Sequence, residues 1–198
     1  TTASQSMSSQ RKTAKRPTSK SPPATTRVVR AAPPPRPSIG QVIGLHDVDD
    51  PLSLHSSVAL ALDAQTGKVL FEKNSLAVLP IASITKLMTA MVVLDGKLPL
   101  DTRLTISRDD YDRLRGSSSR LRAGMTMTRY EMLHLALMSS ENCAASALAR
   151  TYPGGKAAFT KAMNRKARDL GMRNTHYADS TGLHGGNLST AEDLAKLV

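Results

Sequence analysis

Apolar residues between residues 57 and 73 alternate with polar ones, as expected for strands with one buried face. Residues 57–63 read as one strand, residues 65–67 (Gln-Thr-Gly) as a turn, and residues 68–73 as a returning strand. The pattern therefore predicts a β-hairpin. Because an isolated hairpin is marginal in water, we expect further strands or helices to cover it.

From residue 80 onward the apolar positions follow helical spacing, broken by clear stop signals. Thr128-x-x-Glu131 is a capping box, and residues 103–106 and 120–121 are at most short extended segments. A turn-rich loop is expected at residues 179–187. The predicted helices cover residues 83–94, 129–138, 143–150 and 157–170, with a last one, capped by Ser189-x-x-Glu192, running to the chain end. Helices beside a hairpin indicate an α+β fold.

The N-terminal segment has a different composition. Residues 1–45 hold eight Lys or Arg, no Asp or Glu, and seven of the eleven prolines, so most of the net charge of +11 belongs to this segment. Such a composition cannot bury enough apolar surface to offset chain entropy. We predict a disordered segment over residues 1–50 and a folded domain over 51–198. The basic segment is either a plain linker or an arm that contacts anionic envelope polymers or nucleic acid.

The candidate chemistry begins at Ser83-x-x-Lys86, where the predicted helix starts. Residues three apart share a helix face, so Lys86 can reach the Ser83 hydroxyl. A serine hydroxyl needs a neighbour to take its proton, and a free lysine, with a pKa of about 10.4, is protonated at neutral pH. Burial among the apolar residues of this helix can lower that pKa. The alternative is an N-cap serine beside a solvated lysine.

A second motif, Ser140-x-Asn142, accompanies the first, and together they form two of the three boxes of serine acyl-transferases. Ser139 competes with Ser140, but only Ser140 has Asn two places on. With their flanks PIASITKLMTAMVVLD (residues 80–95) and LMSSENCAASALARTYPGG (residues 137–155), these motifs resemble the D-alanyl-D-alanine carboxypeptidase and endopeptidase family of low-molecular-mass penicillin-binding proteins. The resemblance runs from about residue 56 to 198 and is closest to the endopeptidase branch, the penicillin-binding protein 7 type.

The resemblance implies a β-lactamase/transpeptidase-like fold and a serine D-Ala-D-Ala carboxypeptidase or endopeptidase. Ser83 would be the nucleophile that forms an acyl-enzyme, Lys86 its base, Ser140 a proton relay, and Asn142 a substrate-binding residue. Substrates would be peptidoglycan stem peptides and cross-links, with β-lactams as covalent inhibitors, no nucleic acid and no cofactor. It also implies a periplasmic or envelope location and a role in cell-wall biogenesis and cell shape. No signal peptide opens the sequence, so we expect a processed or trimmed N-terminus.

The third family box, Lys-Thr-Gly, is absent from these 198 residues; Gln65-Thr66-Gly67 and Ser180-Thr181-Gly182 lack the cation. We therefore expect a domain truncated before its C-terminal strands, and two alternatives stay open. One is a catalytically incomplete binding protein. The other is a β-lactamase, which in class A needs a Glu after the second box; the acidic residues there have no matching context, namely Asp169, Asp179, Glu192 and Asp193.

Other candidate chemistries receive less support from the sequence. Cys143 is either a thiolate at a helix start or a small packed residue, and the second fits a lone cysteine better. His184-Gly185-Gly186 resembles a lipase oxyanion motif, but no Gly-x-Ser-x-Gly accompanies it, so we read it as a turn. The five histidines show no metal-ligand spacing, so we predict no metal. No apolar run reaches the ~18 residues of a membrane span.

Overall fold

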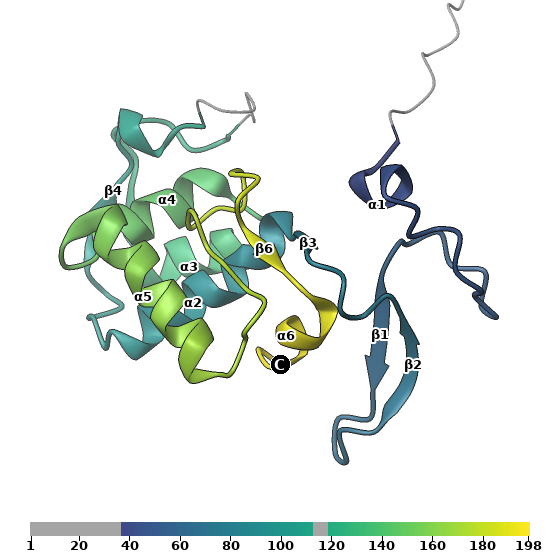
Figure 1. Cartoon of the computed structure of the whole chain (residues 1–198). Coiled ribbons are helices and arrows are strands. Elements are labelled where there is room, and N and C mark those ends of the chain that lie inside the picture. Colours follow the sequence, from purple (N-terminus) through teal and green to yellow (C-terminus); the bar gives the residue numbers. More distant parts are fainter. Residues whose placement is uncertain (1–36, 113–118) are drawn as a thin grey trace, which may run out of the picture. The chain divides into compact units, whose positions relative to one another are not determined.

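The computed structural model describes residues 37–112 and 119–198 (Figure 1). A short helix that the sequence analysis did not predict, α1 (Ile39–Val42), lies within the 1–50 segment. Its start is explained by a capping box, in which Ser38 accepts from the Gln41 N–H and the Gln41 side chain accepts from the Ser38 N–H. The domain boundary at residue 51 stays a prediction, and residues 1–36 lie outside the described part of the chain.

The predicted hairpin is confirmed. Strands β1 (Ala59–Leu62) and β2 (Val69–Lys73) pair antiparallel, with a register irregularity between Ala61 and Leu62. The Asp63 carboxylate organises the turn by accepting from the backbone N–H groups of Gln65 and Thr66 and from the Thr66 hydroxyl. Thr66-Gly67 is therefore part of a hairpin turn.

Four helices carry the core (Figure 1): α2 (Thr85–Asp95), α3 (Arg129–Met138), α4 (Asn142–Arg150) and α5 (Gly155–Asp169). Each matches a predicted helix to within two residues, and the capping box of Thr128 and Glu131 is present. Helix α4 contacts α2, α3 and α5. All seven residues from Cys143 to Ala149 are buried, because five of them are Ala or Ser and let the neighbouring helices approach closely.

The shortest elements were the hardest to predict. Strand β4 (Arg103–Thr105) pairs with β5 (Thr126–Thr128), while residues 120–121, read as extended, form no strand. Strand β3 (Leu79–Pro80) pairs with β6 (Leu188–Ser189), and the sequence analysis predicted neither of these two strands. Two short 3-10 helices are present: η1 (Ala82–Ile84) lies between β3 and α2, and η2 (Arg108–Asp110) lies between β4 and β5. Helix α6 (Ala191–Ala195) is capped by Thr190, one residue later than the predicted Ser189, and it ends at Ala195, before the predicted end at the last residue of the chain.

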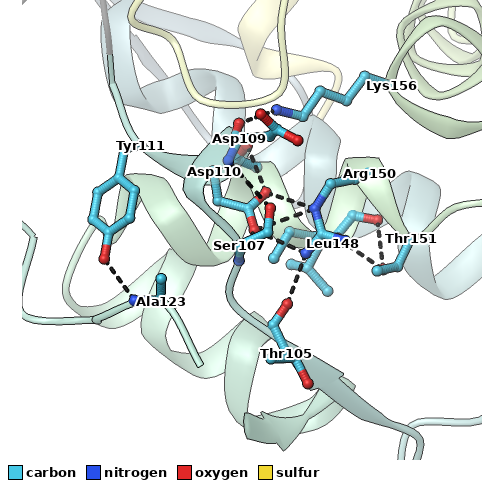
Figure 2. A network of polar contacts seen from close by, with 12 residues as sticks. Thr105, Ser107, Asp109, Asp110, Tyr111, Ala123, Leu148, Arg150, Thr151 and Lys156 are labelled. Carbon is cyan, nitrogen blue, oxygen red and sulfur yellow. Dashed lines mark hydrogen bonds and ion pairs between the residues drawn. The ribbon is translucent and has the colours of Figure 1, made fainter. Parts of the chain in front are cut away.

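A buried ion pair joins η2 to α4 (Figure 2). The Asp110 side chain is fully buried and accepts from Arg150 through both carboxylate oxygens, from Ser146 and from the Ser107 backbone N–H. Arg150 also donates to the Thr105 carbonyl at 2.7 Å, which brings in β4. Burial alone raises the pKa of Asp110, but the hydrogen bonds from Arg150 and Ser107 hold it below the usual range.

Helices beside antiparallel strand pairs confirm the predicted α+β fold class. Among residues 37–112 and 119–198, no helix combines the length and the apolar composition that a membrane span requires.

Candidate active site

Ser83 lies where the chain passes from the short β3–β6 pair into α2. The Ile81 N–H donates to the Asn187 carbonyl at 3.0 Å, which continues the pairing of β3 with β6 up to the start of η1. Ser83 is the middle residue of this 3-10 helix and is exposed, whereas the sequence placed it in the α-helix itself, which begins at Thr85. The tighter turn still leaves Lys86 next to Ser83, with 2.9 Å between Nζ and Oγ.

Lys86 brings the predicted site residues together. Its side chain is buried, with the residue only 2% exposed. Four oxygen atoms surround its Nζ: Ser83 Oγ at 2.9 Å, Ser140 Oγ at 3.3 Å, Asn142 Oδ1 at 2.8 Å and the Thr181 carbonyl at 2.8 Å. The structure therefore places the other three predicted residues around the Lys86 nitrogen, together with Thr181, which was not predicted, and it excludes the alternative of a solvated lysine.

The connection between α3 and α4 presents Ser140 and Asn142. Ser139 ends α3, and Ser140 adopts a left-handed backbone conformation with φ of 53°. Glu141 caps α4 by accepting from the Cys143 N–H, so the capping role belongs to Glu141 and not to the Ser-x-Asn pair. Of the two adjacent serines, Ser140 is the one that contacts Lys86.

The environment shifts the pKa of Lys86 downward. Burial is the largest cause, since it penalises the ammonium form. The negative charges of Asp179 and Glu141 oppose this effect and raise the pKa. A lowered pKa enlarges the fraction of neutral amine near neutral pH, which is the form that can accept a proton.

The loop at residues 178–187 contributes to the site, although the sequence identified it only as turn-rich. The Thr181 carbonyl accepts from Lys86, and the neighbouring Ser180 carbonyl accepts from the Thr89 hydroxyl at 2.8 Å. Ser180 Oγ donates to the Ala145 carbonyl at 3.0 Å. Consecutive residues of the loop are thus bound to α2 and α4, which carry Lys86 and Asn142.

Gly182 allows this loop to touch the start of η1. Its φ is +87°, and a Cβ placed there would lie 1.9 Å from the Ala82 carbonyl oxygen and 3.0 Å from the Ser83 nitrogen. Only glycine combines this conformation with so close an approach. The Thr181-Gly182 pair was the only sequence signal for this close approach, and the sequence analysis considered the pair only as an incomplete Lys-Thr-Gly box.

The remaining candidates fall outside this site. Cys143 is 1% exposed within the core, and burial raises the pKa of its thiol, so it is a packed residue. His184 accepts from the Gly186 N–H within the exposed part of the loop, as expected for a turn. In residues 37–112 and 119–198 no three His, Cys, Asp or Glu side chains gather closely enough to hold a metal ion.

A cavity of about 600 Å³ lies beside the loop, lined by Asp179, Ser180, Thr181 and Leu183 together with residues of η2, α4 and α5. Lys156, which borders it, donates to the Asp109 carbonyl at 2.6 Å (Figure 2). Ser83, Lys86, Ser140 and Asn142 do not line this cavity.

Comparisons with known proteins agree on one family. The family model described as D-alanyl-D-alanine carboxypeptidase matches residues 46–198. The D-alanyl-D-alanine endopeptidase of Pseudomonas aeruginosa is 54% identical over 172 residues, which cover 86% of this chain and 52% of that protein. The D-alanyl-D-alanine endopeptidase of Escherichia coli is 52% identical over 143 residues, covering 72% of this chain and 46% of that protein.

The chain is also similar in structure to solved enzymes of the same kind. A mutant of the Streptomyces K15 DD-transpeptidase has a TM-score of 0.66 at 33% identity, covering 71% of this chain and 58% of that one. The D-alanyl-D-alanine carboxypeptidase DacD from Francisella tularensis has a TM-score of 0.65 at 35% identity, covering 73% of this chain and 36% of that one. The chain spans about half the length of the curated relatives it matches.

Proposed function

Since the chain belongs to the peptidase S11 family of D-alanyl-D-alanine carboxypeptidases, we propose that the protein is a serine D,D-peptidase with Ser83 as its nucleophile. The observation that carries the proposal is the buried Lys86 with its Nζ 2.9 Å from Ser83 Oγ. A base within hydrogen-bond distance of a nucleophile is the geometry that nucleophilic catalysis requires.

In the proposed reaction, the neutral Lys86 amine takes the Ser83 hydroxyl proton as Oγ attacks the carbonyl of a D-Ala peptide bond. The C–N bond then breaks, and the proton passes through Ser140 to the leaving amine, giving an acyl-enzyme. Water hydrolyses this ester and regenerates the Ser83 hydroxyl. Asn142, whose Oδ1 accepts from Lys86, would also hydrogen-bond to the substrate backbone.

The proposed substrates are the stem peptides and cross-links of peptidoglycan, and β-lactams would acylate Ser83 as substrate mimics. Because the two relatives described above are named endopeptidases, cross-link cleavage is the proposed main activity. This activity implies a periplasmic or envelope location and a role in cell shape. The eight basic residues of the 1–45 segment would contact anionic envelope polymers.

The decisive experiment is labelling with fluorescent penicillin, followed by mass spectrometry. It uses the 198-residue chain and a chimera that continues this chain with the part of the Pseudomonas aeruginosa endopeptidase that follows the aligned region, where the family resemblance places the Lys-Thr-Gly box. We expect the chimera to carry a stable adduct on Ser83 and Ser83→Ala to carry none. Rapid penicillin turnover would instead identify a β-lactamase, and a chimera that folds without any adduct would indicate a binding protein.

Gly182→Ala should slow acylation of the chimera by tenfold or more. The new methyl group would force the 179–184 turn away from Ala82 and Ser83, and a strained left-handed backbone adds about 1–3 kcal/mol. The matched control is Gly171→Ala, at a φ of +71° with no atom within 4 Å of the new Cβ. It should lose stability but keep the parental acylation rate. Equal rates in both variants and the parent would show that the close approach is unimportant.

A further inference from the structure

The four oxygen atoms around Lys86 Nζ are of two chemical kinds. The Thr181 carbonyl and Asn142 Oδ1, both at 2.8 Å, can only accept hydrogen bonds. The hydroxyls of Ser83 and Ser140 can donate as well. A neutral amine has two hydrogens and one lone pair. If the two pure acceptors take both hydrogens, the lone pair is left for a hydroxyl, and Ser83 is the nearer one.

One carboxylate holds the Thr181 carbonyl in place. Asp179 accepts from the Thr181 N–H and hydroxyl, at 3.2 and 2.7 Å, and from the Gly182 N–H at 2.9 Å. The His184 N–H and the amide of the fully buried Asn187 donate to the same carboxylate. The Thr181 and Gly182 N–H groups belong to the two peptide groups that flank the Thr181 Cα, and the second of these contains the Thr181 carbonyl. The orientation of that carbonyl therefore depends on Asp179.

On these grounds, and resting on the function proposed above, we propose that Asp179 is a positioning residue for Lys86. It fixes the 179–182 turn so that the Thr181 carbonyl, together with Asn142, directs the lone pair of the neutral amine at the Ser83 hydroxyl. Asp179 touches neither Ser83 nor the substrate in this role and acts entirely through Lys86.

The charge of Asp179 has a second effect on the same lysine. The charged groups that face Lys86 are Asp179 from the loop and Glu141 from the α3–α4 connection, and both raise the Lys86 pKa against the lowering effect of burial. Asp179 stays ionised: burial raises its pKa, but the hydrogen bonds from Thr181, Gly182 and Asn187 lower it below the ordinary value. Removing this charge must therefore lower the pKa of Lys86.

The test is a ¹³C NMR titration of the Lys86 Cε in the 198-residue chain, comparing the parent with Asp179→Asn. We expect the midpoint to fall by about one pH unit, the lower end of the effect of a nearby opposite charge. The matched control is Asp193→Asn, which removes another buried carboxylate that accepts from Asn174 and Thr175. Asp193 does not act on Lys86, so its variant should keep the parental midpoint. An unchanged midpoint in Asp179→Asn, or equal shifts in both variants, would overturn the proposal.

Acylation of the chimera gives the second readout. In Asp179→Asn the pH profile of acylation should move to lower pH, because more of the Lys86 amine is neutral. The plateau of the profile should fall at least tenfold, because that amine is poorly oriented. Thr181→Val keeps the charge and removes one donor to Asp179; it should lower the plateau without moving the profile, and it also serves if Asp179→Asn fails to fold. A parental plateau in a folded Asp179→Asn or in Thr181→Val would contradict the positioning role. If the parent chimera fails to acylate, the proposed function fails, while the NMR titration still judges the link between Asp179 and Lys86.

Discussion

Replacing Lys86 with alanine is expected to slow penicillin acylation of Ser83 in the chimera by a factor of about 10²–10⁴, the usual contribution of a general base. The physical reason is that Lys86 Nζ, at 2.9 Å, is the one nitrogen within hydrogen-bond distance of Ser83 Oγ in the described part of the chain. The measurement is the second-order acylation rate with fluorescent penicillin across pH. The parental rate should rise with pH as Lys86 loses its proton, and the variant should lack that rise.

Lys86→Arg distinguishes the effect of proton transfer to residue 86 from the effect of its positive charge. Arginine keeps a cation near Ser83 but stays protonated at any working pH, so this variant should be as slow as Lys86→Ala. Lys166→Ala is the control, because Lys166 pairs with Asp95 at the surface, away from the site, and should acylate at the parental rate. Acylation by Lys86→Arg at the parental rate would remove proton transfer to Lys86 from the mechanism.

Asp110→Asn should lower the free energy of unfolding of the 198-residue chain by about 3 kcal/mol. Breaking a buried ion pair costs about 3–5 kcal/mol, and we expect the lower end because the Arg150 side chain keeps 29% exposure. The asparagine NH₂ would face donors that now point at a carboxylate, either those of Arg150 and Ser107 (Figure 2) or the Ser146 hydroxyl. Urea unfolding followed by circular dichroism gives the difference.

The pH dependence of that difference follows from the direction of the pKa shift. The folded-state pKa of Asp110 is lowered, so its carboxylate contributes full stability above the unfolded pKa of about 3.9. That contribution is lost as the pH falls through the lower folded pKa. The difference in unfolding free energy between the parent and Asp110→Asn should therefore shrink below about pH 4.

The control variant is Asp95→Asn, which breaks a surface ion pair and should cost at most about 1 kcal/mol. An equal loss of unfolding free energy in both variants would contradict the importance of the buried pair.

Local signals were enough to predict the hairpin and the four long helices. Asp63 and Gly67 make the turn that the Gln-Thr-Gly segment predicted, and Thr128 with Glu131 starts α3 at the predicted residue. Ser83, Lys86, Ser140 and Asn142 were identified from motif spacing, and the structure brings their side chains together. Their catalytic roles stay predictions, which the labelling and the Lys86 variants test.

The Thr181 carbonyl was missed because every residue carries a carbonyl, so a backbone acceptor has no signature in sequence. Asp179 was considered only as a possible β-lactamase base, since its hydrogen-bond partners could not be read from its neighbours. Strands β3 and β6 have two residues each, too few for an alternating pattern, and they pair across more than a hundred residues. Such contacts follow from tertiary packing and not from local propensity.

The single cysteine of the chain, Cys143, is a natural probe for local opening of the packing around α4. Cys143 is adjacent to Asn142, and its thiol is enclosed where α4 packs against the other core helices. A thiol reagent reaches it only while that packing is transiently broken, so the rate of modification measures how often the packing around α4 opens. The protein can therefore report the local stability of its candidate site without any engineered label.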